Sequence, residues 1–186
     1  MELRDWILGE HNSVRNRFER SITEIVPVDR WRDPAGTGGS SIAYLLFHVT
    51  YHADLAVGPV LAGEEPRVHE WRDRLGLAGA GPSAGLGETE DTDLSSVVDP
   101  DALQGYADAV HTVTTGWIER GDLDATVDAP AALERSGVSA ADVPWLHSMW
   151  SGQPASFFVQ WEAIGHRMNH LGEMVSVRNR LGLSPF

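Results

Sequence analysis

The chain has 186 residues and a mass of 20.3 kDa, which fits one domain or two small ones at most. Its 27 acidic and 14 basic residues give a formal net charge of −13, which argues against binding to nucleic acid or to an anionic membrane surface. It contains no cysteine, which excludes disulfides, cysteine-ligated metal centres and a cysteine nucleophile. All the basic residues are arginine, so a Schiff-base lysine and a P-loop lysine are also excluded, and eight histidines remain as the main chemical groups.

The sequence predicts neither a membrane span nor a secretory signal. No apolar run approaches the roughly 18 residues that a membrane span needs. The first ten residues, MELRDWILGE, lack a basic stretch followed by an apolar one. We therefore expect a cytoplasmic protein.

Helical periodicity predicts four long helices. The first covers Glu2–Ile25, where apolar residues recur at spacings of four and three, and it ends before Pro27. The second covers Ser41–Leu61, with Ser40 or Ser41 as its N-cap. The third covers Pro100–Arg120, with Asp99 as N-cap and proline at the first helical position.

The fourth helix is predicted over Pro154–Leu181. Apolar residues lie on two of its sides, so we expect it to be central and largely buried. Residues 62–98 and 121–152 are expected to be long, largely irregular connections, with short helices near Val68–Leu75 and Ser139–Trp145. Strand signals are weak throughout. The sequence therefore predicts an all-α fold, a single four-helix bundle over residues 1–186 with long connections.

Two pairs of histidines stand out in these helices. His166 and His170 are four residues apart, so their imidazoles project from one side of the fourth helix within reach of one ion. They lie in an otherwise apolar stripe, and a buried imidazole needs a partner for each ring nitrogen. His48 and His52 repeat this spacing on the second helix. Such pairs can converge on a metal ion in a bundle core; the alternative is histidines held by ordinary hydrogen bonds.

The segments SSIAYLLFHVTYHADL (40–55) and GHRMNHLGEMVSVRNRLGL (165–183) resemble the DinB-like superfamily of metal-binding four-helix bundles. The resemblance covers nearly the whole chain and is most specific in the HxxxHxGE segment. It implies a metal held by His48, His166 and His170. The family includes transferases that use bacillithiol, mycothiol or glutathione, and it is related to the N-terminal domains of mycothiol-dependent maleylpyruvate isomerases. The resemblance also implies a homodimer and no contact with DNA.

Three further residues near these ligands have open roles. His52 is an extra histidine relative to the family pattern, and it could be a fourth ligand, a base or a surface residue. Glu162 and Glu173 flank the histidine pair of the fourth helix and could accept hydrogen bonds from the ligands or lie on a solvated edge. The mycothiol-dependent isomerase branch has glutamate where this chain has His166, which weakens a direct transfer of the isomerase activity to this chain.

The expected function follows from three neutral ligands around one divalent ion, with zinc or nickel favoured among the metals that imidazole suits. Such an ion would remain a strong Lewis acid that lowers the pKa of bound water to about 7 or stabilises a thiolate. A low-molecular-weight thiol such as mycothiol would supply the sulfur that the chain lacks. We expect a metal-dependent thiol S-transferase or isomerase acting on a small molecule. The alternatives are a metal-assisted hydrolase and a non-enzymatic stress protein that binds a metal or a small molecule.

Overall fold

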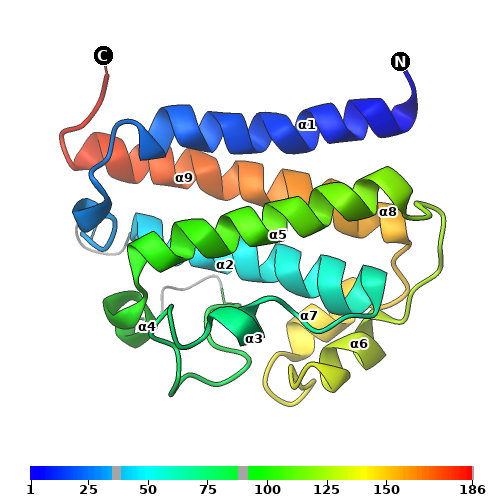
Figure 1. The fold of residues 1–186 in the computed structure, drawn as a ribbon. Helices are drawn as coiled ribbons and strands as arrows, with labels where there is room; N and C mark the ends of the chain where they lie inside the picture. The colour runs from blue at the N-terminus through cyan, green and yellow to red at the C-terminus, as the bar shows by residue number, and fades with distance from the viewer. Residues whose placement is uncertain (35–38, 88–91, 186) are drawn as a thin grey trace.

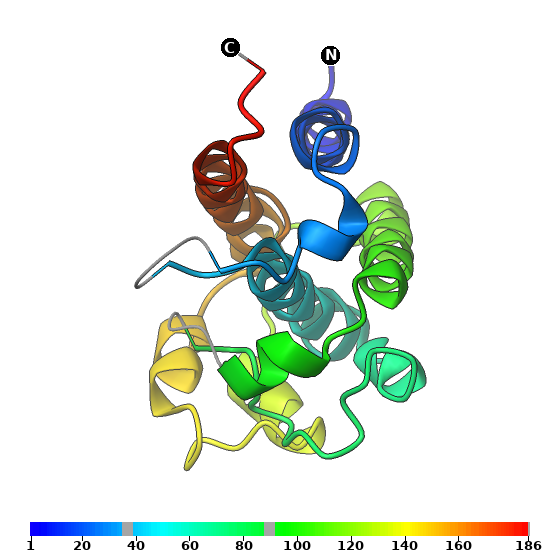
Figure 2. The same ribbon diagram turned by 90° about the vertical axis from the view of Figure 1, so that its left-hand side faces the viewer.

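A computed structural model describes residues 1–34, 39–87 and 92–185 of the chain. Four long helical segments pack side by side, with short helices of the connections gathered at one side of them (Figures 1 and 2). Within the described ranges there is no β-strand, and one isolated bridge pairs Thr126 with Pro154. The predicted all-α class is confirmed.

The first two long helices begin and end close to the predicted residues. Helix α1 (Leu3–Phe18) continues into a π-helical turn, η1 (Glu19–Thr23). Helix α2 (Ile42–Leu55) continues into a second π-helical segment, η3 (Ala56–Ala62). Of the two serines proposed as N-cap of α2, Ser41 fills this position, because its hydroxyl accepts a hydrogen bond from the backbone N–H of Tyr44 at 3.1 Å.

The other two long helices also match their predicted ranges. Helix α5 (Pro100–Arg120) has Asp99 as its N-cap, and the Asp99 carboxylate accepts from the backbone N–H of Ala102 at 2.8 Å. The last helical stretch consists of α8 (Ala155–Phe158), η4 (Val159–Gly165) and α9 (His166–Arg180), which follow one another without a break.

The connections contain more helix than the sequence predicted. Their short helices are η2 (Val28–Arg30), α3 (Val68–Trp71), α4 (Thr92–Val97), α6 (Ala129–Arg135) and α7 (Pro144–Trp150). The helix predicted near Ser139–Trp145 is wrong, because the segment turns helical only at Pro144, whose fixed φ suits the first helical position. Helix α6 was missed although Asp128 caps it. Residues 88–91 of the connection predicted over 62–98 lie outside the described ranges.

Helix α2, and not the last helix, is the centre of the molecule. Every residue of α2 is buried, whereas α9 keeps one exposed side. Figure 2 shows α2 between α1, α5 and α9 on one side and the short helices α4, α6 and α7 on the other. The prediction of a central fourth helix was wrong because the long connections fold over α2 and cover the side that a four-helix bundle leaves to solvent.

The continuous helix Ile42–Ala62 is long and apolar enough to cross a membrane by length and composition, which corrects the expectation that no segment approaches this limit. Inside this molecule, however, 89% of its most apolar 18-residue stretch is buried. A core helix of a soluble protein has this combination of apolarity and burial. The packing of the bundle therefore accounts for the composition of the helix.

Candidate metal centre

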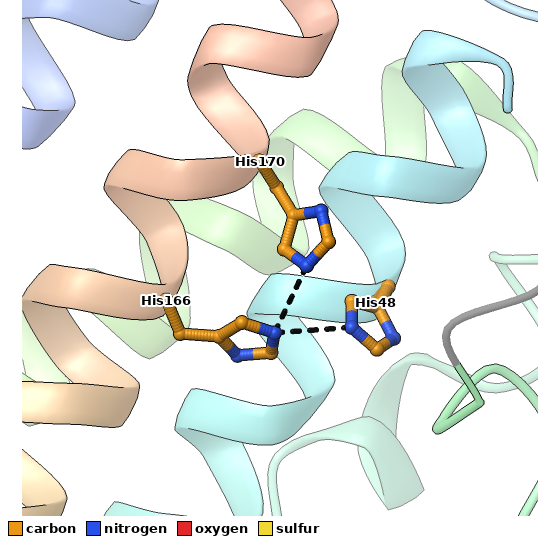
Figure 3. Close-up of side chains that lie close together, drawn as sticks. All are labelled: His48, His166 and His170. Carbon is orange, nitrogen blue, oxygen red and sulfur yellow. Dashed lines mark hydrogen bonds between the residues drawn. The ribbon is translucent and has the colours of Figure 1, made fainter. Parts of the chain in front are cut away.

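Helix α2 and helix α9 lie side by side and bring His48, His166 and His170 to one point, as Figure 3 shows. The Nε2 atom of His166 lies 3.1 Å from Nε2 of His48 and 3.0 Å from Nε2 of His170. All three side chains are buried. We call these three residues the histidine triad.

The other ring nitrogen of each triad residue faces a hydrogen-bond acceptor. His48 Nδ1 lies 2.8 Å from the carbonyl oxygen of Gly85, His166 Nδ1 lies 3.1 Å from Glu162 Oε2, and His170 Nδ1 lies 3.1 Å from Glu173 Oε2. These acceptors place the proton of each neutral ring on Nδ1. With the proton on Nδ1, each Nε2 atom directs its lone pair toward the point where the three rings meet.

A divalent ion fits this arrangement. Zinc–nitrogen bonds of 2.0–2.1 Å in tetrahedral geometry would place the ligand nitrogens about 3.3 Å apart, within a few tenths of an ångström of the observed separations. A proton is a poor substitute for the ion: burial and the neighbouring imidazoles lower the pKa of His48 to about 3. Burial also lowers the pKa of His166, although the hydrogen bond to Glu162 opposes this. The histidine triad could therefore hold a metal ion.

The two glutamates support the histidine triad to different extents. Glu162 is completely buried, and its Oε1 atom also accepts a hydrogen bond from Trp150 Nε1 at 2.8 Å. Burial alone would raise the pKa of Glu162, but the hydrogen bond from His166 and the proximity of His52 outweigh it and hold the pKa at about 2. Glu162 is thus a fixed carboxylate, whereas the side chain of Glu173 is 57% exposed. Both glutamates are thus placed to accept a hydrogen bond from the Nδ1 atom of a triad histidine, Glu162 from His166 and Glu173 from His170.

His52 lies beside the histidine triad and faces other partners. Its Nε2 atom lies 3.1 Å from the carbonyl oxygen of Leu86, and its Nδ1 atom lies 3.4 Å from Glu162 Oε2. His52, Glu162 and His166 form a second group of potential ligands. Glu162 faces Nδ1 of His166, whereas the triad meets at Nε2, so the two groups occupy opposite edges of the same ring.

Sequence analysis missed the loop that holds both histidines of α2. The carbonyl oxygens of Gly85 and Leu86 accept from His48 and His52. Gly85 has a φ of +82°, and a Cβ there would lie 2.4 Å from the Phe47 ring, so only glycine lets the loop approach α2 this closely. A glycine in a Gly-rich connection carries no sequence signal for this role.

Aromatic rings surround the two histidine pairs. Trp161 stacks on His166 with 5.8 Å between ring centroids and 14° between the ring planes. Trp145, which is 40% exposed, stacks on His52 at 6.0 Å. These rings lower the polarity around the histidine triad, and Trp145 contacts His52 while part of its ring stays exposed.

Comparison with known proteins supports the fold and gives no information on the chemistry of the site. No protein-family model matches the chain, and no curated protein matches it. A solved structure described as the crystal structure of a conserved protein of locus from Enterococcus faecalis is similar, with a TM-score of 0.68 and 17% identity. The match covers 98% of this chain and 99% of the other. At this identity, the likeness shows a shared fold only.

Proposed function

We propose that the protein binds one divalent transition-metal ion, zinc or nickel, at the histidine triad, and that it is a transferase acting with a low-molecular-weight thiol on a small-molecule substrate. The observation that carries the metal proposal is the convergence of three Nε2 lone pairs whose Nδ1 atoms are all held by acceptors. The thiol part rests on the resemblance to DinB-like proteins and on the absence of cysteine, which leaves the sulfur to a cofactor such as mycothiol.

The chain would supply three neutral ligands and two supporting carboxylates. When bound, a divalent ion with only three protein ligands provides a Lewis acid with an open position that can hold a thiol as its thiolate. Glu162 and Glu173 would keep the protons of His166 and His170 on Nδ1, so that both Nε2 atoms stay available as ligands. The carbonyl of Gly85 would do the same for His48. A cytoplasmic location belongs to this proposal, since thiols are kept reduced there.

Elemental analysis of protein purified without an affinity tag tests the metal proposal. We expect about one zinc or nickel ion per chain in the wild type and much less in His170→Ala. Circular dichroism of both proteins should show the same helical content, because the substitution removes one side chain and alanine is a good helix former. Wild-type protein that holds no metal after growth with zinc and nickel would contradict the proposal.

A turnover assay tests the thiol proposal separately. Metal-loaded and metal-stripped protein would be incubated with mycothiol, bacillithiol or glutathione and a chromogenic aryl halide, so that thiolate attack releases halide. We expect turnover only with the metal-loaded form, and we expect it to be lost in His170→Ala. A metal-loaded protein that turns over none of the three thiols would refute the transferase and leave the metal site standing. Hydrolysis of an activated ester by that protein would favour the hydrolase.

A further inference from the structure

Arg167 is a buried charged group that forms no ion pair with any residue that the structure describes. The side chain of Arg167, in the first turn of α9, is only 8% exposed, and its Nη1 atom has no hydrogen-bond partner within the described ranges. The guanidinium group stays charged at neutral pH, so its burial without an anion is costly. A buried charge of this kind is normally paired.

Arg178 on the same helix shows the ordinary arrangement. It is 5% exposed, but its Nη1 atom donates to the carbonyl oxygen of Ser21 at 2.9 Å, and its Nη2 atom donates to Asn179 Oδ1 at 2.9 Å. The chain can therefore satisfy a buried guanidinium on α9 with its own acceptors. Among the described residues, none accepts a hydrogen bond from Arg167 Nη1, which points to a partner from outside the chain.

Arg167 lines a cavity of about 90 Å³ between α1, α2 and α5, which we call the Arg167 cavity. Phe18, Leu46 and Ala107 form apolar parts of its wall, and Thr23 and Gln104 add polar groups. This volume has room for a few water molecules or for one short organic acid.

The acidic residues of the Arg167 cavity are already engaged at its rim. Glu19 and Asp108 also line it, but they pair with Arg15 at 3.0 Å and 2.6 Å, and their side chains are 43% and 59% exposed. The charged neighbour that acts on Arg167 is Arg15, which repels it. The electrostatic field at Arg167 therefore favours an incoming anion.

We propose that the Arg167 cavity binds a short-chain monocarboxylate and that Arg167 holds the carboxylate group. The planar guanidinium matches a carboxylate with two parallel hydrogen bonds. The apolar wall at Phe18, Leu46 and Ala107 suits a tail of a few carbons. Phosphate carries more charge and has no apolar part, and the carboxylates of Glu19 and Asp108 at the rim would repel it more strongly.

The Arg167 cavity is distinct from the histidine triad. Leu46 precedes His48 by two residues on α2, which places the two side chains about 200° apart around the helix. Arg167 follows His166 by one residue, about 100° around α9. The cavity also contains residues of α1 and α5, and none of the triad lines it. This inference does not depend on the metal or on the thiol.

Titration calorimetry with sodium butyrate tests the proposal, with 1-butanol as the uncharged probe and ionic strength held constant with sodium chloride. We expect saturable binding of one butyrate per wild-type chain and none of butanol. Arg167→Met should weaken binding by about tenfold or more, because the charge-assisted pair is lost. Arg180→Met, an exposed arginine on the same helix, should bind as the wild type does. Equal binding by Arg167→Met and wild type would overturn the proposal, as would inorganic phosphate binding where butyrate does not.

Two further variants separate this site from the alternatives. A carboxylate can also bind a metal ion, so binding that is lost in His170→Ala and kept in Arg167→Met would place butyrate at the triad and overturn the proposal. Thermal unfolding without ligand distinguishes a binding role from a structural one. If Arg167 is unpaired, Arg167→Met should melt at or above the wild-type temperature, whereas Arg178→Met should melt below it. A strongly destabilised Arg167→Met would instead identify a structural arginine satisfied by water.

Discussion

The histidine triad and the pair formed by His11 and His111 are both partly or wholly buried histidine clusters, but their rings are held in opposite ways. The triad rings have their Nδ1 atoms bonded and their Nε2 atoms meeting at one point. In the pair, the rings stack with centroids 4.2 Å apart and planes 11° from parallel. There the Nδ1 atoms have no hydrogen-bond partner within the described ranges, and Nε2 of His111 lies 3.1 Å from Asn12 Oδ1.

This difference shows that the orientation of the rings, and not their number or burial, distinguishes a candidate metal site. The lone pair of an imidazole nitrogen lies in the plane of the ring, so two stacked rings direct their lone pairs along parallel planes that do not meet. The charges around this pair also disfavour a metal ion. Burial lowers the pKa of both rings, and the guanidinium groups of Arg15 and Arg167 lower it further. The same positive charges would repel a metal cation. The pair is therefore a neutral core contact between α1 and α5.

The largest expected effect separates the two clusters directly. His48→Ala, His166→Ala and His170→Ala should each weaken metal binding more than 100-fold, beyond the 10–100-fold that loss of a supporting residue costs, because each removes a ligand. His11→Gln should leave metal content unchanged. Competition with a chromogenic chelator measures the affinities. Loss of metal from His11→Gln, with the triad variants unaffected, would reverse the assignment.

The next effect tests how the carboxylates support the histidine triad. Glu162→Gln should weaken metal binding by about 10–100-fold, because the buried amide can no longer fix the proton of His166 on Nδ1 by charge. Glu173→Gln should cost only a few-fold, since the Glu173 side chain is 57% exposed and water can replace it. The same chelator competition compares the two. An equal or larger loss in Glu173→Gln would mean that burial does not decide the strength of support.

The pair formed by His11 and His111 predicts how the free energy of unfolding depends on pH. Burial, followed by the charge of Arg167, lowers the pKa of His11 from 6.5 to about 4. Between these values the unfolded chain binds the proton better than the folded chain does, so the free energy of unfolding falls as the pH falls. For metal-stripped protein, His11 should account for about 2 kcal/mol of the loss between pH 7 and pH 5. Urea unfolding of wild type and His11→Gln at both pH values measures it, and identical pH dependence would contradict it.

Sequence patterns predicted the long helices and the pair His166 and His170 because both depend on local spacing, whereas the selection of His48 as their partner came from the resemblance to DinB-like proteins. Periodicity and caps such as Asp99 decide where a helix begins, and a spacing of four places His166 and His170 on one side of it. The spacing could not decide between His48 and His52, since both lie on the same side of α2. That choice depends on the Gly85–Leu86 backbone, which lies more than thirty residues further along the chain.

The parts that sequence reasoning could not predict depend on contacts between distant segments. The central position of α2 arises from the connections that fold over it, and their packing has no periodic signature (Figure 2). The partner of Trp150, the buried carboxylate of Glu162, is equally invisible in the sequence. From the sequence alone, Arg167 is an ordinary arginine of a helix, next to the first histidine of the HxxxH motif. Only the packed structure shows that Arg167 lines a cavity and that its Nη1 atom has no hydrogen-bond partner in the part of the chain that is described.

The smallest expected effect concerns His52. A ring one turn away, about 5.4 Å along the axis of α2, cannot take the coordination position of His48. His52 Nε2 also faces the Leu86 carbonyl and not the meeting point of the triad. His52→Ala should therefore keep about one metal ion per chain, with an affinity change well below that of Glu162→Gln. Its remaining effect should come through Glu162, which loses one neighbour but keeps His166 and Trp150.

Elemental analysis of His52→Ala beside His48→Ala measures this contrast. If metal content collapses in His52→Ala and survives in His48→Ala, the ion belongs to the second group, formed by His52, Glu162 and His166. In that case Glu162 would be a ligand rather than a supporting acceptor, and Glu162→Gln would have to abolish metal binding outright. If His52→Ala keeps its metal while His48→Ala loses it, the ion lies on the Nε2 edge of His166, where the three lone pairs converge.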